Sequence, residues 1–265
     1  MVIWKQVESG KQLKIINYKL KIIKYISLLF FAILLFSFQK KHITVYMIGD
    51  STMSIKLPEK RPETGWGMPF ASFFDNTVTI INRAMNGRST RTFISENRWQ
   101  PIVDTLKEGD YVFIQFGHND ESKEKTDRYT SPEDYTTNLI KFVTEAKNKK
   151  AIPVLLTPLV RRRYDSAGKF YDVHGVYPDK VREVAKQYHV ALIDMQQSSA
   201  KLLAQLGKEE SIKLFNHLIP GEHPNYPAGI TDDTHFNEYG AIQMAQLAKQ
   251  GLIEIKSPLA ERLNK

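Results

Sequence analysis

The stretch HITVYMIGDST, residues 42–52, decides the fold of this 265-residue chain. After the histidine, its side chains are aliphatic, aromatic or β-branched, which is typical of a strand buried on both faces of a parallel sheet. Gly49 ends the run, so Asp50 and Ser51 follow at the carboxyl end of the strand, where α/β sheets hold their ligands. In a turn leading into a helix, Ser51 could present its hydroxyl and its backbone N–H to one carbonyl group. An isolated Gly-Asp-Ser is more often a plain turn or helix cap.

Four further short apolar runs follow along the chain. These runs are Thr77–Ile81, Tyr111–Phe116, Ile152–Thr157 and Val190–Ile193. Between them, apolar residues recur at helical spacing after the caps Ser131 and Asn237 and within residues 179–188 and 198–206. This alternation of strand and helix predicts a three-layer α/β/α sandwich. Residues 158–178 and 214–236 show neither pattern, and we expect them to be long irregular loops, which in compact domains are often functional.

The composition excludes several classes of protein. Hydrophobic residues make up 42% and charged residues 25%, so the chain as a whole is not disordered. It has no cysteine, which excludes disulfides, a thiol nucleophile and Cys-ligated metals. The net charge of +8 suggests nucleic acid, but residues 1–41 hold eight lysines and one acid, which leaves 29 basic and 28 acidic residues elsewhere. The excess charge therefore belongs to the N-terminal segment, and we expect no nucleic-acid partner.

That N-terminal segment has the features of an export signal. Tyr25–Phe38 is an uncharged run of 14 residues behind several lysines, shorter than the about 20 apolar residues that a spanning helix needs. We expect residues 1–40 to be a signal peptide or an N-terminal membrane anchor; a buried core helix is the alternative. The folded domain would then cover residues 41–256, with a C-terminal tail at 257–265. We expect the domain to be exported, periplasmic or extracellular, and to touch a membrane only through an uncleaved leader.

Three more polar blocks lie after later strands or before the last helix. Gly87, in block 84–90, lets a backbone N–H approach a ligand closely, and Asn119, after the third strand, carries an amide that can donate to an oxyanion. Asp232 can reach Nδ1 of His235 across three residues, which leaves Nε2 to accept a proton. Alone, each block has an ordinary interpretation as a turn, a loop asparagine or a metal-binding or capping pair. Together with Ser51 they supply a nucleophile, oxyanion donors, a base and its orienting group.

These blocks resemble the SGNH (GDSL-type) hydrolase superfamily, whose four blocks carry the residue types of Ser51, Gly87, Asn119 and His235. A closer likeness is to the rhamnogalacturonan acetylesterases, which are carbohydrate esterases acting on pectin. It rests on GDST at 49–52, WG at 66–67, NGRSTRTF at 86–93, QFGHND at 115–120 and DDTHF at 232–236. Asn97 departs from the glycine expected in that family, which concerns a loop and not the catalytic set.

The resemblance implies a flavodoxin-like sheet of five parallel strands in the order 2-1-3-4-5. It also implies two-step acyl transfer without a metal or other cofactor. Ser51 would be the nucleophile, His235 the base and Asp232 its orienting group. The backbone N–H groups of Ser51 and Gly87 and the amide of Asn119 would form the oxyanion hole. The implied activity is a serine esterase that removes O-acetyl groups from an acetylated pectic polysaccharide or oligosaccharide, above all rhamnogalacturonan.

Four residues near these blocks are the expected substrate contacts: Arg88, Arg91, Trp99 and His118. Rhamnogalacturonan is a polyanion because every second sugar is a galacturonic acid, and arginine pairs with carboxylates in a bidentate manner. Trp99 could offer an apolar platform to a sugar ring. Both arginines, like the run 161–163, could instead pair with acids inside the domain or face solvent.

Other functions remain open at this point. The same scaffold suits a lipase, a thioesterase or an acetylesterase acting on another glycan such as xylan. A non-enzymatic alternative is a secreted glycan-binding module whose site has decayed. A metal hydrolase could use Asp232, His235, His118 and Asp120 as ligands. We expect a monomer.

Overall fold

The computed structural model describes residues 17–27 and 40–264, and the chain divides into two compact units, Met1–Lys41 and His42–Lys265. In the first unit, residues 17–27 form a helix. Most of the apolar run that we interpret as an export signal lies outside the described residues. In the described ranges, no helix has both the length and the apolar character to cross a membrane.

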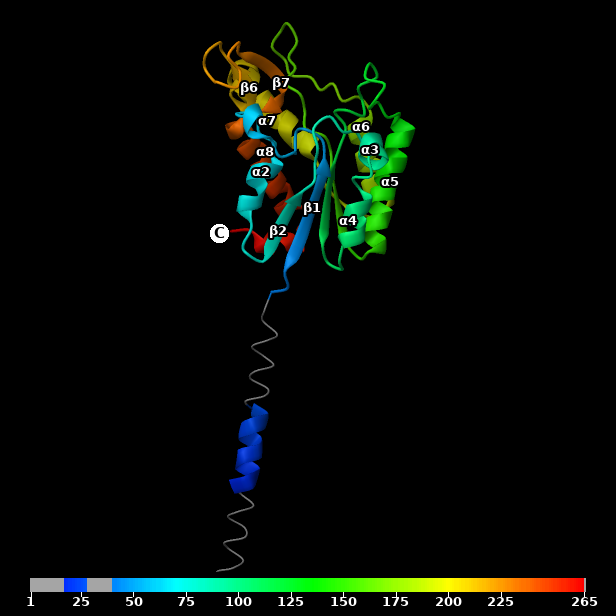
Figure 1. The fold of residues 1–265 in the computed structure, drawn as a ribbon, viewed down its shortest axis with the longest axis vertical. Coiled ribbons are helices and arrows are strands. Elements are labelled where there is room, and N and C mark those ends of the chain that lie inside the picture. Colours follow the sequence, from blue (N-terminus) through cyan, green and yellow to red (C-terminus); the bar gives the residue numbers. More distant parts are fainter. Residues whose placement is uncertain (1–16, 28–39, 265) are drawn as a thin grey trace, which may run out of the picture. The chain divides into compact units, whose positions relative to one another are not determined.

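The second unit is built on a five-stranded parallel sheet (Figure 1). Its strands are β1 (Ile43–Gly49), β2 (Val78–Asn82), β3 (Tyr111–Gln115), β4 (Ile152–Leu156) and β5 (Ala191–Ile193). The strand order is β2-β1-β3-β4-β5, and every pair is parallel. Both the predicted fold class and the predicted order are therefore confirmed. Each strand begins and ends within about one residue of its predicted apolar run.

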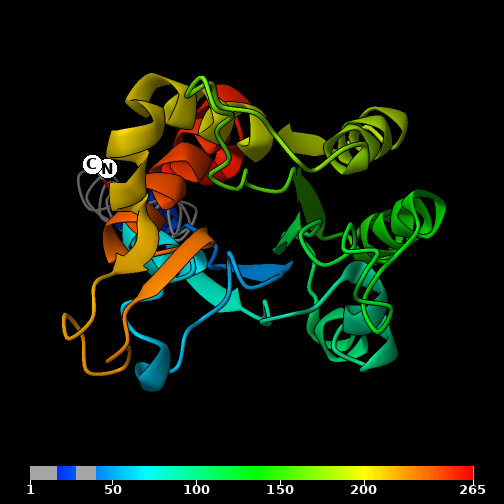
Figure 2. The same cartoon turned by 90° about the horizontal axis from the view of Figure 1, so that it is seen from above.

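Helices cover both faces of the sheet, as Figure 2 shows in a view along the strands. One face carries α3 (Thr90–Ser95), α4 (Gln100–Thr105), α5 (Pro132–Asn148) and α6 (Tyr177–Gln187), and the other carries α2 (Gly67–Phe70), α7 (Met195–Ser211) and α8 (Glu238–Glu254). Strand β1 serves both cores because its side chains alternate. Val45 and Met47 face one core, and Tyr46 and Ile48 face the other.

The longer helices begin where their capping residues predict. Ser131 accepts a hydrogen bond from the backbone N–H of Asp134, and Asn237 accepts one from Gly240. The apolar face of α5 is buried against the sheet, as its spacing predicts. Helix α7 is longer than its apolar pattern indicates, because Asp194 caps it earlier and it continues through a kink at Gly207.

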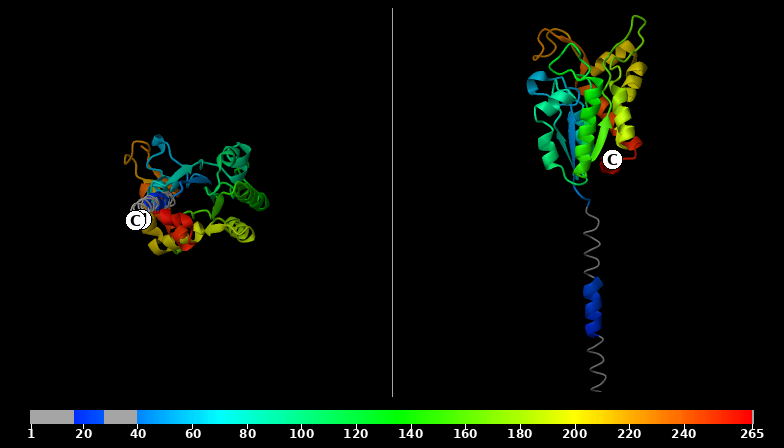
Figure 3. Two further views of the ribbon diagram at one scale, coloured as in Figure 1. Left: turned by 90° about the horizontal axis from the view of Figure 1, so that it is seen from below. Right: turned by 90° about the vertical axis from the view of Figure 1, so that its right-hand side faces the viewer.

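Two segments differ from the sequence-based expectation. Residues 214–236 are not wholly irregular, since β6 (Phe215–Leu218) and β7 (Ile230–Phe236) pair as an antiparallel ribbon beyond the carboxyl ends of the sheet strands (Figure 3). The expected tail after residue 256 belongs to the domain as far as residue 264, because Leu259 is fully buried in the core and Leu263 bridges to Phe74. The remaining short helices are η1 (Pro58–Lys60), η2 (Ala71–Phe73), η3 (Ile212–Leu214) and η4 (Pro258–Arg262).

Candidate active site

Ser51 lies in a tight turn directly after β1, at the carboxyl edge of the sheet. The turn does not lead into a helix as expected; a long loop follows it instead. Asp50 is completely buried behind the turn and shapes it, because its Oδ1 accepts from Thr52 N at 2.9 Å and Thr52 Oγ1 at 2.8 Å. Burial alone would raise the pKa of Asp50, but its interaction with His118 and these hydrogen bonds outweigh burial and lower the pKa.

The β6–β7 ribbon brings Asp232 and His235 to this serine. Nε2 of His235 is 2.8 Å from Ser51 Oγ, and Nδ1 is 2.7 Å from Asp232 Oδ2. The other carboxylate oxygen of Asp232 accepts from the backbone N–H groups of Thr234 and His235 at 2.8 and 3.0 Å. Burial would raise the pKa of Asp232, but the bonds from His235 outweigh it and lower the pKa to about 2. The carboxylate is therefore ionised at neutral pH, and it favours the His235 tautomer with a free Nε2 lone pair.

Three hydrogen-bond donors border the space beside Ser51 Oγ. In the described part of the chain, the backbone N–H groups of Ser51 and Gly87 donate to no other group. Gly87 has φ +74°, a conformation that glycine adopts without strain. The amide of Asn119 gives one hydrogen to the carbonyl of Arg88 at 3.0 Å, which leaves its second hydrogen unused. The structure thus brings together the residues expected to form an oxyanion hole.

The Gly87 turn is anchored by residues that the sequence did not single out. Oδ1 of Asn86 accepts from Ser54 Oγ at 2.5 Å and from Lys56 Nζ at 2.7 Å. Lys56 is buried and pairs with Glu63 at 2.7 Å; burial lowers the pKa of its ammonium group, and Glu63 partly offsets that effect. The turn that carries the donor N–H is therefore held by buried Lys56, which is itself paired with Glu63.

A pocket of about 450 Å³ opens above Ser51, and its lining includes three cations beside the acids Glu63 and Asp232. Lys125, Arg128 and Arg161 line it together with the residues described above. The guanidinium of Arg128 is 3.4 Å from Asn119 Oδ1, and a Cβ added to Gly87 would meet it at 3.2 Å. Arg128 could not be predicted from the sequence, because no local pattern shows which way an isolated loop arginine points.

The expected substrate contacts are mostly placed elsewhere. Arg88 pairs with Glu96 at 3.0 Å, and Arg91 donates to the Thr126 carbonyl at 2.7 Å, so both guanidinium groups are used within the domain. Trp99 is only 2% exposed and donates to Glu145, so it belongs to the core and cannot be a sugar platform. None of these three side chains lines the pocket above Ser51, whereas His118 does.

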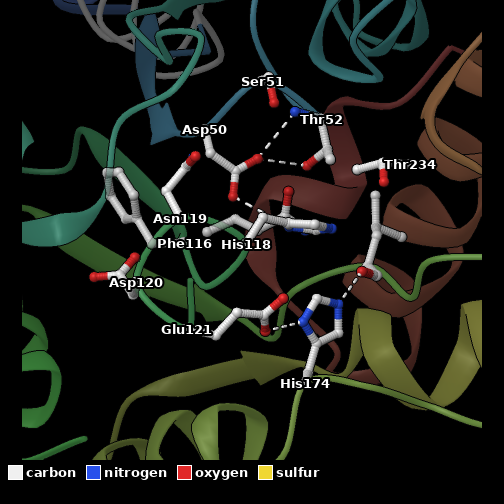
Figure 4. Close-up of polar contacts among 12 residues, drawn as sticks. Asp50, Ser51, Thr52, Phe116, His118, Asn119, Asp120, Glu121, His174 and Thr234 are labelled. Atoms are coloured by element: carbon white, nitrogen blue, oxygen red, sulfur yellow. Dashed lines mark hydrogen bonds and ion pairs between the residues drawn. The ribbon is translucent and has the colours of Figure 1, made fainter. Parts of the chain in front are cut away.

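His118 lies in a buried polar network beneath the pocket (Figure 4). Its Nδ1 is 3.2 Å from Asp50 Oδ2, and its ring meets that of His174 edge to face at 4.6 Å. Burial lowers the pKa of His118 although Asp50 opposes the shift. His174 behaves differently: burial would lower its pKa, but its hydrogen bond to Glu121 outweighs that effect and raises the pKa. His118 thus supports the loop of Ser51, and it lines the pocket although the residue is only 4% exposed.

The run of three arginines holds the ribbon in place. Arg161 donates to Thr234 Oγ1 at 2.8 Å and pairs with Glu121 at 3.1 Å. Arg162 is 7% exposed and pairs with the Asp233 carboxylate at 3.0 Å. Its backbone N–H also donates to the backbone carbonyl of Asp233. Arg163 reaches the other oxygen of that carboxylate at 3.2 Å. These three arginines thus bind Asp233 and Thr234, the residues between Asp232 and His235. Their guanidinium groups are therefore used within the domain and do not form a solvated face.

The residues considered as metal ligands do not converge on a shared site. Asp120 accepts from Thr90 N and Oγ1 at 2.9 and 2.6 Å on the far side of the oxyanion loop, and His118 is bonded to Asp50. Within residues 17–27 and 40–264, no cluster of three or more His, Asp or Glu side chains could hold a metal ion.

Comparison with known proteins agrees with this geometry. The profile of the "GDSL-like Lipase/Acylhydrolase family" matches residues 47–241. The chain is 41% identical to rhamnogalacturonan acetylesterase RhgT of Bacillus subtilis over 84% of its own length and 95% of that protein. It is 36% identical to the probable rhamnogalacturonan acetylesterase YesY of Bacillus subtilis, over 83% of this chain and 97% of that protein.

Among solved structures, protein YXIM of Bacillus subtilis superposes with a TM-score of 0.70 and 25% identity. The match covers 82% of this chain and 58% of that one. The family profile, the two relatives and the five-stranded sheet with Ser51 at its carboxyl edge lead to one assignment. The chain belongs to the GDSL-like lipase/acylhydrolase family.

Proposed function

We propose that this protein is a serine esterase that removes O-acetyl groups from the rhamnogalacturonan part of pectin. One observation carries the chemistry: the hydrogen-bonded chain from Ser51 Oγ through His235 to Asp232, beside two backbone N–H groups that donate to no acceptor among the described residues. Such an array is suited to acyl transfer from an ester.

The reaction follows from these positions. Ser51 Oγ attacks the acetyl carbonyl while His235 Nε2 takes its proton, and Asp232 stabilises the resulting imidazolium. The N–H groups of Ser51 and Gly87 and the free amide hydrogen of Asn119 receive the oxyanion. His235 then protonates the departing sugar oxygen, which leaves as a hydroxyl group. Water, deprotonated by the same imidazole, releases acetate from Ser51.

The substrate assignment rests on the relatives and on the pocket. Both Bacillus subtilis relatives are named rhamnogalacturonan acetylesterases, one of them as probable. The pocket above Ser51 is rimmed by Lys125, Arg128 and Arg161, which suits a polyanionic glycan better than a lipid acyl chain. For the same reason we favour an acetylesterase over a lipase or a thioesterase as the function of this protein.

We also propose that the domain works outside the cytoplasm, as a monomer. The basic N-terminal segment and the apolar run that follows it support export, since pectin is an extracellular polymer. Cell fractionation with an antibody against the domain tests this, and full-length chain found soluble in the cytoplasm would contradict it.

The experiment that tests the function measures acetate release from acetylated rhamnogalacturonan and from acetylated xylan of equal acetyl content. We expect the pectic substrate to react faster, and Ser51→Ala to lose activity by at least about 10³-fold with its fold intact. Asp232→Asn tests the tautomer role and should cost about 10³–10⁴-fold in kcat. A faster reaction with xylan would leave the serine esterase standing and discard the pectic assignment.

A further inference from the structure

A second pocket of about 670 Å³ lies next to the one above Ser51. The two pockets share Ser122, Lys125 and Arg161 on their walls. Nothing in the acyl-transfer chemistry requires this second space. Because the walls are shared, a chain molecule whose acetylated unit sits over Ser51 can continue into it.

Four cations and two acids line the second pocket, and Arg161 and Arg163 are already paired with Glu121 and Asp233. Lys123, Lys125, Arg161 and Arg163 line it, against the acids Glu121 and Glu124. Glu121 is already used, because it accepts from His174 and pairs with Arg161. The ammonium groups of the two lysines are exposed and, in the described part of the chain, have neither a hydrogen bond nor an ion pair.

The opposite wall is apolar and firmly held. Val173 and Val176 are 39% and 50% exposed and line the pocket. Between them His174 is buried and bonds Glu121, as Figure 4 shows. Its Nε2 lies 2.7 Å from the carbonyl oxygen of Leu159. The wall is therefore positioned by buried hydrogen bonds and presents aliphatic surface, against which the C–H face of a sugar ring can pack.

We propose that this second pocket is a subsite for a uronic acid residue of the same polysaccharide chain whose acetylated sugar lies over Ser51. The ammonium groups of Lys123 and Lys125 bind its carboxylate, and Val173 and Val176 support its ring. This inference rests on the proposed pectic substrate. In place of the expected contacts Arg88, Arg91 and Trp99, substrate recognition is then carried by residues that line the pocket beside the catalytic one.

The first test is the double variant Lys123→Gln/Lys125→Gln. We expect its KM for acetylated rhamnogalacturonan oligosaccharides to rise about three- to tenfold, with kcat changed less, because exposed charge pairs contribute modestly. The preference over p-nitrophenyl acetate in kcat/KM should fall by the same factor, and added salt should weaken the wild-type preference. The matched control is Lys186→Gln/Lys201→Gln, which removes two exposed helix lysines elsewhere and should leave both substrates unaffected.

A second measurement separates this inference from the proposed function. A rhamnogalacturonan oligosaccharide without acetyl groups should inhibit hydrolysis of p-nitrophenyl acetate, and its carboxyl-reduced form should inhibit at least threefold less well. The lysine variant should remove that difference. Equal inhibition by both oligosaccharides, or an unchanged KM in the variant, would overturn the subsite. Wild-type enzyme that prefers acetylated xylan would instead overturn the proposed substrate, and the inhibition experiment would still decide whether a carboxylate is bound.

Discussion

Asp120 lies completely buried behind the oxyanion loop, and burial raises the pKa of its carboxyl to about 7 although hydrogen bonds from Thr90 oppose the shift. Its Oδ1 accepts two bonds from Thr90, while Oδ2 has no partner among the described residues. In the unfolded chain an aspartate titrates near about 3.9. The folded state therefore keeps this proton between about pH 4 and 7, where the unfolded state has released it. The contribution of this group to the free energy of unfolding is fully present below the pKa of the unfolded state. It is lost as the pH rises through the pKa of the folded state.

Replacing Asp120 with asparagine tests this titration. The amide keeps the acceptor for Thr90 and removes the ionisable group. The variant therefore should not lose unfolding free energy at high pH through ionisation of a buried carboxyl. From pH 5 to pH 8 the unfolding free energy of the wild type should fall by roughly 2–3 kcal/mol relative to the variant. Urea unfolding of both proteins at the two pH values measures the difference. Parallel pH dependences would show that Asp120 ionises normally in the folded protein.

The element that distinguishes this site is the β6–β7 ribbon, since it carries both Asp232 and His235. Its sequence, ITDDTHF from residue 230, lacks the apolar alternation by which strands are found, because its polar side chains face Ser51 and the arginines instead of a core. The ribbon could therefore not be predicted, although the spacing of the two residues could. The contacts that hold the ribbon are also non-local, because Arg162 lies 71 residues before its partner Asp233.

Arg162→Lys should loosen the ribbon, because lysine cannot reproduce the fork that joins Asp233, Ser211 and the Lys208 carbonyl. We expect kcat for p-nitrophenyl acetate to fall about tenfold, since small misplacements of a base cost that much or more. The control is Arg182→Lys, which weakens a comparable fork to Asp194 away from the site. Both variants should lower Tm by a few degrees, and only the first should lower kcat. Equal kcat values would show that the arginine serves stability alone.

At the scale of the whole molecule, the five strands and the long helices follow from apolar periodicity and caps, and the sheet order follows from the resemblance to a known family. The directions of the arginine side chains could not be predicted in this way. Arg88 and Arg91 lie beside a site glycine in sequence yet turn to Glu96 and a carbonyl, whereas Arg128 reaches the pocket from a distant loop. The direction of a long charged side chain depends on partners far along the sequence, which no local pattern reveals.

The division of the chain into Met1–Lys41 and His42–Lys265 predicts that the second unit folds by itself. It contains both hydrophobic cores and every residue of the site. A chain that begins at Lys40 should keep its kcat for p-nitrophenyl acetate within about twofold and its Tm within a few degrees, because no interaction within the unit is removed. Thermal unfolding followed by circular dichroism, together with the esterase assay, measures both quantities against the full-length chain. A large loss of either would show that the first unit supports the second.

Ser51 and His235 are bonded across 184 residues of sequence. During synthesis the serine leaves the ribosome early, and its base follows only when most of the chain has been made. Phe236, next to that base, packs against α8, so the last helix must also be complete before the ribbon is seated. A nascent or prematurely terminated chain therefore contains the nucleophile but no esterase activity.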